Sequence, residues 1–312
     1  MPSSSNIDAL LSSPELGNRR DATRGWLLGG LGVAIFAMTL PMTRLAVGDA
    51  SAPQLHPGFV TAGRAAVAGL LSVLYLLAVR APRPPRALWS ALAVSALGTV
   101  VGFPLGLALA VREVPAVHAA VVTGVLPLAT AVIAALATRQ RPSAAFWTCA
   151  LLGCGLVLAF AAWQGGGALT AADGWLLLAV LSAATGYVAG ARAAAVMPAQ
   201  QVICWVLVGC LPLTAPIAWA WLPAAPVQPS AWLGFAYTAV FSMWLGFFAW
   251  YRGLALGGVM RVSQVQLLQP FLALLFAVPV LGEALDPLTV VFSLAIIGVV
   301  FVGRRLPVRH VT

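Results

Sequence analysis

The chain is divided into apolar stretches of membrane-spanning length, and this pattern constrains its fold more than any other feature. Spanning roughly 30 Å of hydrocarbon takes about 20 apolar residues, because an α-helix rises about 1.5 Å per residue. Stretches that meet this requirement lie at residues 26–47, 58–79, 87–110, 116–137, 145–164, 174–192, 200–222, 230–252, 263–281 and 287–303. The pattern predicts an all-α membrane protein with ten transmembrane helices.

Composition excludes a water-soluble fold. The 312 residues are 61% hydrophobic and 8% charged, whereas about a quarter of the residues in soluble domains are charged. The connections between the apolar stretches, such as RAPRPPR and QGGGALTAADG, are short and rich in Pro and Gly. They are too short for a soluble catalytic domain.

The basic residues indicate how the helices are oriented. All 17 are arginines, and most of them lie in alternate connections and in the two tails. These are Arg19, Arg20, Arg24, Arg80, Arg83, Arg86, Arg139, Arg141, Arg192, Arg252, Arg261, Arg304, Arg305 and Arg309. By the positive-inside rule, both tails (1–25 and 304–312) are expected in the cytoplasm of a bacterial-type inner membrane. Because topology accounts for the charge of +9, no nucleic-acid partner is expected.

The two halves of the chain have the same order of helices. A shift of 143 residues aligns AVVTGVLPLATAVIAAL with SQVQLLQPFLALLFAVP, which matches Pro127 to Pro270, and then matches Gly155 to Gly298. Each half contains five predicted helices, an odd number, so the second copy must be inverted in the membrane. The sequence therefore predicts two inverted five-helix repeats, at 26–164 and 174–303.

The repeated segments carry a family resemblance. Three segments resemble the drug/metabolite transporter superfamily, specifically its EamA family. They are REVPAVHAAVVTGVLPLATAVIAALATRQRPS, YRGLALGGVMRVSQVQLLQPFLALLFAVPVLGEALDP, and GRAAVAGLL around Arg64. The resemblance implies a ten-helix bundle around a central cavity that exports a small organic metabolite, often an amino acid, by alternating access. One departure is that Gly282-Glu283, typical of the family after the ninth helix, is replaced in the first half by Arg139-Gln140.

Polar residues inside a span are the first candidates for substrate binding, because they are costly in a membrane. Gln264, Gln266 and Gln269 precede Pro270, which lacks a backbone donor. Their amides can bind a substrate or, alternatively, cross-link helices. His118 with Thr123 is a second candidate, as a proton relay or, alternatively, as an interfacial histidine near Glu113.

Aromatic residues form a third candidate group. Trp244, Phe248 and Tyr251 follow helical spacing, and with Tyr187 they could grip an apolar side chain.

Arg64 has two open interpretations, attraction of a substrate carboxylate or a structural role through headgroup anchoring. The acidic residues lie near the ends of the predicted spans, so a buried carboxylate relay is not expected.

These features predict a secondary transporter that exports small organic metabolites, most of all amino acids. A carrier of nucleotide sugars, lipid-linked or drug-like solutes is an alternative, and a membrane enzyme is less well supported because catalytic groups do not cluster. The sequence has no P-loop, HExxH or CxxC motif, so neither a cofactor nor a metal is expected. The expected partners are a small-molecule substrate and the lipid bilayer, and the expected assembly is a monomer.

Overall fold

The computed structural model describes residues 14–137, 141–164, 169–194, 196–257, 263–305 and 308–309. The first half contains α2 (Pro14–Val47), α3 (Pro57–Ala78), η1 (Arg86–Leu88), α4 (Trp89–Ser95), η2 (Ala96–Gly102), α5 (Phe103–Glu113), α6 (Ala116–Thr123), α7 (Leu126–Ala137) and α8 (Ala144–Gln164). The second half contains α9 (Ala171–Ala194), α10 (Ala199–Ala220), α11 (Pro229–Tyr237), η3 (Thr238–Leu245), α12 (Gly246–Gly257), η4 (Ser263–Leu268), α14 (Gln269–Leu281) and α15 (Pro287–Arg305). The short strands β1 (Arg141–Pro142) and β2 (Val308–Arg309) pair antiparallel.

Seven helical stretches of the described chain are long and apolar enough to cross a membrane. Three further apolar helices, Trp147–Trp163, Gln269–Leu281 and Pro287–Val299, are shorter. All ten fall on predicted segments, but the number of crossings stays a prediction. α2 begins at Pro14, so the helix extends into the residues that were assigned to the first tail.

Several of the spanning stretches are interrupted, and the interruptions recur in both halves. The π-helical segment η2 corresponds to η3 at the 143-residue offset, and the start of α7 at Leu126 corresponds to the start of α14 at Gln269. Pro127 and Pro270 lie in the first turns of these two helices, where a missing backbone N–H costs least. The prolines therefore explain where α7 and α14 begin.

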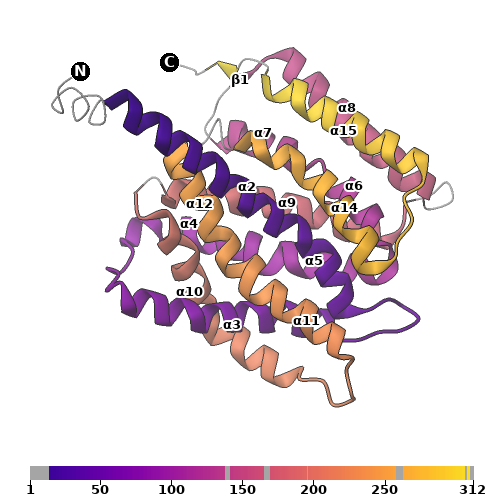
Figure 1. Cartoon of the computed structure of the whole chain (residues 1–312), viewed down its shortest axis with the longest axis horizontal. Coiled ribbons are helices and arrows are strands. Elements are labelled where there is room, and N and C mark those ends of the chain that lie inside the picture. Colours follow the sequence, from indigo (N-terminus) through magenta and orange to yellow (C-terminus); the bar gives the residue numbers. More distant parts are fainter. Residues whose placement is uncertain are drawn as a thin grey trace, which may run out of the picture.

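The helices of one half pack mainly against helices of the other (Figure 1). α2 packs on α12 and α14, α3 on α10, α5 on α9, α6 on α14, and α8 on α15. Small residues permit the closest contacts, as expected where helices associate in a membrane. A Cβ atom at Gly98 of η2 would lie 2.7 Å from the backbone of Gly186 in α9.

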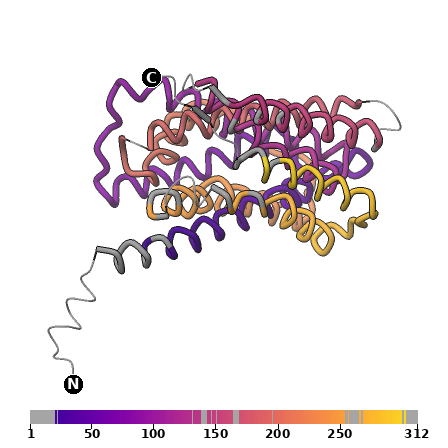
Figure 2. The backbone as a smooth tube through the Cα atoms, turned by 90° about the horizontal axis from the view of Figure 1, so that it is seen from above, coloured from indigo at the N-terminus to yellow at the C-terminus, as the bar shows by residue number. Residues whose placement is uncertain are grey.

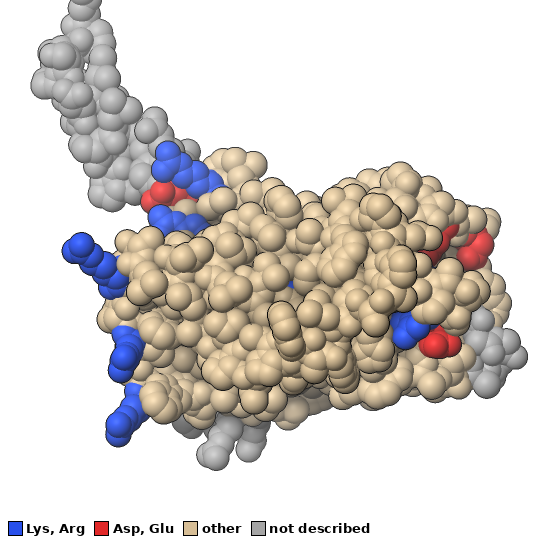
Figure 3. Space-filling model, turned by 90° about the horizontal axis from the view of Figure 1, so that it is seen from below, with Lys and Arg blue, Asp and Glu red and all other residues tan. Residues whose placement is uncertain are grey.

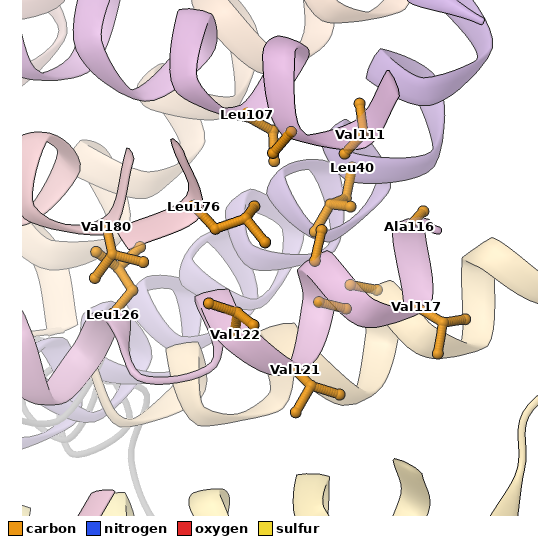
Figure 4. Packing of buried hydrophobic residues seen from close by; sticks show 14 of the residues in the cluster. Leu40, Leu107, Val111, Ala116, Val117, Val121, Val122, Leu126, Leu176 and Val180 are labelled. Atoms are coloured by element: carbon orange, nitrogen blue, oxygen red, sulfur yellow. The ribbon is translucent and has the colours of Figure 1, made fainter. Parts of the chain in front are cut away.

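Buried aliphatic side chains from several helices meet between the halves (Figure 4). Leu40, Leu107, Val122 and Leu176 come from α2, α5, α6 and α9, and all four belong to one buried cluster. The core thus lies where the two halves face each other.

The two ends of the bundle differ in charge. α2 begins and α15 ends at the same end of the molecule (Figures 1 and 2). On the face in Figure 3, arginines gather at this basic end, and most of the acidic side chains lie at the opposite, acidic end. This separation agrees with the charge pattern of the sequence.

Candidate substrate site

A small cavity lies midway along the bundle, between the two halves. It consists of two adjoining chambers of about 30 and 20 Å³, which share Phe36, Thr39, Phe103 and Gln269. The larger chamber, the glutamine chamber, is also lined by Ala37, Leu40, Leu107, Thr123, Leu126, Pro127, Gln266, Pro270 and Ala273. The smaller chamber, the arginine chamber, is also lined by Arg64, Thr99, Tyr187, Ser242 and Phe247.

The interrupted helices supply part of the polar lining of this cavity. Thr99 lies in η2, Ser242 in η3 and Gln266 in η4. Irregular backbone at membrane depth is tolerated where it faces a cavity or protein. Broken helices at the interface between repeats are a common feature of transporter binding sites.

The predicted glutamine group reaches this cavity. Gln266 is buried, and Gln269 lines both chambers, with its buried side-chain oxygen lacking a hydrogen-bond partner among the described residues. Gln264 lies in η4, but its side chain is outside the described part of the structure. Thr123 lines the glutamine chamber and donates to the Ala119 carbonyl oxygen at 2.7 Å.

The predicted aromatic group is divided. Tyr187 lines the arginine chamber, whereas Trp244 and Phe248 contact each other in a tilted arrangement and meet Tyr75 of α3 edge to face, outside the lining of both chambers. Trp244 and Phe248 share one face, as their i, i+4 spacing predicts, but that face packs against Tyr75 of α3. Phe247, which the sequence did not single out, lines the arginine chamber. This geometry does not support substrate contact by Trp244 or Phe248.

Arg64 is fully enclosed in the protein. Its side chain belongs to a residue that is 2% exposed, and Nη2 donates to Ser242 Oγ at 3.0 Å. The alternative in which Arg64 anchors lipid headgroups is therefore wrong, because the guanidinium lines the arginine chamber.

His118 lies away from the cavity, at the acidic end. It is 4% exposed and its Nε2 lies 2.7 Å from Oδ1 of Asp173, which is 1% exposed. The other carboxylate oxygen, Oδ2, accepts from the Thr170 backbone N–H at 2.8 Å and from its hydroxyl at 2.7 Å. His118 is thus neither exposed to headgroups nor bonded to Glu113. Asp173 lies near the start of α9, at the end of a span as the sequence indicated, but it is buried.

Glu283 joins the two halves at the same end. Its two carboxylate oxygens accept from the backbone N–H groups of Ala116 and Val117, at 2.8 and 2.7 Å, at the start of α6. Gly282 makes this possible, since it ends α14 in the left-handed conformation with φ 68°. His118, Glu283 and Asp286 border a cleft of about 200 Å³.

The sequence analysis did not identify Asp173 as a partner of His118, although a local sequence pattern marks its position. Thr170 and Asp173 have the spacing of a capping box at the start of α9, and Asp173 N–H donates back to Thr170 Oγ. This pattern marks the start of a helix but does not identify His118 as a partner. The described residues include no group of three or more His, Cys, Asp or Glu side chains that could hold a metal ion.

Comparisons with known proteins agree with the geometry. The model of the EamA-like transporter family matches residues 23–162 and again residues 170–304. The chain belongs to the EamA-like transporter family. The relative "Uncharacterized transporter YdeK" of Bacillus subtilis (strain 168) is 42% identical over 285 residues, which cover 91% of this chain and 98% of the relative. A solved crystal structure that is 21% identical matches with a TM-score of 0.61 over 91% of this chain and 98% of that one, and so has the same fold.

The EamA-like transporter is therefore a multi-pass membrane protein, and the family resemblance of its sequence is confirmed. The two family matches correspond to the two halves whose interrupted helices meet at the cavity. The substrate-binding roles of individual residues stay predictions.

Proposed function

We propose that this EamA-like transporter exports small organic metabolites, most of all amino acids, across the cytoplasmic membrane by alternating access. In this proposal ten helices form two inverted repeats, and both ends of the chain lie in the cytoplasm. The observation that carries the proposal is a cavity at the middle of the spans, lined by both halves, whose mainly apolar walls include the polar side chains of Arg64, Gln266 and Gln269.

The size of the cavity supports a cycle of opening and closing. Its chambers of about 30 and 20 Å³ have room for about one or two water molecules. A metabolite needs more space, so the two halves must move apart to admit it. The helix breaks before Pro127 and Pro270 are suitable hinges, because they lie in the cavity wall and at equivalent places in the two halves.

Charge supports the proposed orientation. The start of α2 and the end of α15 lie at the basic end (Figures 1 and 2), as the positive-inside rule requires of a cytoplasmic end. A reporter fused to the C-terminus tests this orientation: green fluorescent protein should fluoresce and alkaline phosphatase should stay inactive. Active phosphatase at this position would contradict the proposed orientation.

The function itself is tested with proteoliposomes loaded with a panel of labelled amino acids. We expect efflux of one class, and we expect Gln269→Ala to lower its rate about five- to tenfold, since a lost hydrogen bond is worth about 1 kcal/mol. Gln201→Ala is the matched control, because Gln201 lies at the start of α10, outside the cavity walls. Absence of efflux for every amino acid would overturn the assignment to amino acids and favour another solute class.

A further inference from the structure

Arg64 holds a positive charge inside the bundle with most of its donors unused. Ser242 Oγ accepts from Nη2 at 3.0 Å and also from the Thr39 hydroxyl at 2.7 Å. The buried Nε and Nη1 atoms find no acceptor among the residues that the structure describes. A guanidinium carries five N–H donors, so this arrangement leaves it largely unsatisfied.

No carboxylate in the described part of the chain pairs with this charge. The walls of both chambers contain no acidic residue. The described chain has two ion pairs, Arg44–Asp49 and His118–Asp173, and neither includes Arg64. Glu113, Glu283 and Asp286 lie at helix ends or in connections, away from the middle of the spans.

An unpaired charge at this depth needs an explanation. Arginine side chains in membrane proteins ordinarily reach toward the headgroups or pair with a carboxylate, and Arg64 does neither. Burying a charge without a partner is costly. Arg64 lines the arginine chamber together with Tyr187 and Gln269, whose side-chain oxygen also lacks a partner among the described residues. The missing partner is therefore expected to come from the transported molecule.

We propose that Arg64 is the anion-binding residue of the central cavity and that the exported molecule carries a carboxylate. The proposal rests on the proposed function and names its substrate class. A carboxylate carries one negative charge and would neutralise the one guanidinium, and its two oxygens suit adjacent N–H donors. A phosphate monoester would bring a charge of about −1.5 to −2 and leave an excess. Gln269 then accepts from a donor elsewhere on the substrate.

Ligand binding to the purified full-length protein, measured in detergent, is a test of this inference that does not depend on transport. The probes are the standard amino acids and short monocarboxylates, each compared with its primary amide, and the readout is the shift in unfolding temperature. We expect a carboxylate, but not its amide, to stabilise the protein. Arg64→Met should weaken that binding about 10- to 100-fold, as expected for hydrogen bonds to a charged group, and Arg64→Lys should restore part of it.

The ligand-free proteins separate binding from a structural role. Arg64→Met should unfold at the same or a higher temperature than the wild type, since it removes an unpaired buried charge. Arg44→Met is the matched control: it removes donors to the Val111 and Val114 carbonyl oxygens, so it should lower the unfolding temperature and keep the preference for carboxylates. The inference would be overturned if amides stabilised the protein as much as carboxylates, or if no carboxylate stabilised it. It would also be overturned if Arg64→Met kept the preference for carboxylates. Carboxylate binding without efflux would instead contradict the proposed function.

Discussion

Buried polar and charged groups are hydrogen-bonded within the protein at the acidic end, whereas Arg64 in the arginine chamber keeps most of its donors free. At the acidic end, Asp173 is bonded on both carboxylate oxygens and Glu283 on both of its own. In the arginine chamber, Arg64 has one acceptor among the described side chains. Groups that hold a fold together are satisfied within it, whereas groups that bind a ligand keep donors or acceptors free. The comparison assigns the acidic end to stability and the chamber to binding.

Asp173 provides the strongest test of the stabilising role. Asp173→Ala leaves His118 buried without its partner and removes the capping box of α9, so we expect a loss of about 3 kcal/mol in the free energy of unfolding. The measurement is unfolding of the full-length protein in mixed micelles of increasing SDS content. Asp173→Asn keeps one acceptor oxygen and should lose less. A stable Asp173→Ala protein with impaired efflux would break the comparison, because the pair would then serve transport.

Glu283 should have a smaller effect. Glu283→Ala removes a carboxylate from two backbone donors at the start of α6, and the expected cost is about 1 to 2 kcal/mol in the same unfolding measurement. Glu283→Gln keeps an acceptor and serves as the control. If Glu283→Ala matched the wild type, the contact between Glu283 and α6 would not link the halves.

Substitution of Asp286 should have the smallest effect on stability, and this effect should appear only at acidic pH. The Thr289 hydroxyl and then the Thr289 backbone N–H donate to Asp286 at the start of α15 and lower the pKa of its carboxyl. A lowered pKa in the folded state stabilises the protein above the unfolded pKa of about 4, and this stabilisation is lost as pH falls through the lower folded value. Asp286→Asn should therefore show a weaker decrease in unfolding midpoint as the pH falls below about 4. Parallel pH profiles for the two proteins would contradict this role.

Local sequence patterns were sufficient for most of the fold. Apolar length placed the helical stretches, and the 143-residue offset related the two halves. The first signal depends on residues within one stretch, and the second on a comparison of two stretches. A membrane makes them strong, because every backbone polar group in the apolar layer must be satisfied within the protein.

The candidate site was predictable only in part. The residues around Pro270 identified Gln266 and Gln269, since a polar cluster beside a proline is visible within one segment. The spacing of Trp244 and Phe248 predicted a shared face, but not that this face packs against Tyr75 of α3 instead of the cavity.

Contacts between distant segments depend on how the helices pack. Asp173 meets His118, Glu283 meets α6, and Arg64 meets Ser242 only because helices from opposite halves lie side by side. Membrane-spanning length and proline position are properties of a single segment and can be read from the sequence. Which polar group finds a partner, and which stays free beside a cavity, depends on the relative placement of the helices, and this is decided by packing in three dimensions.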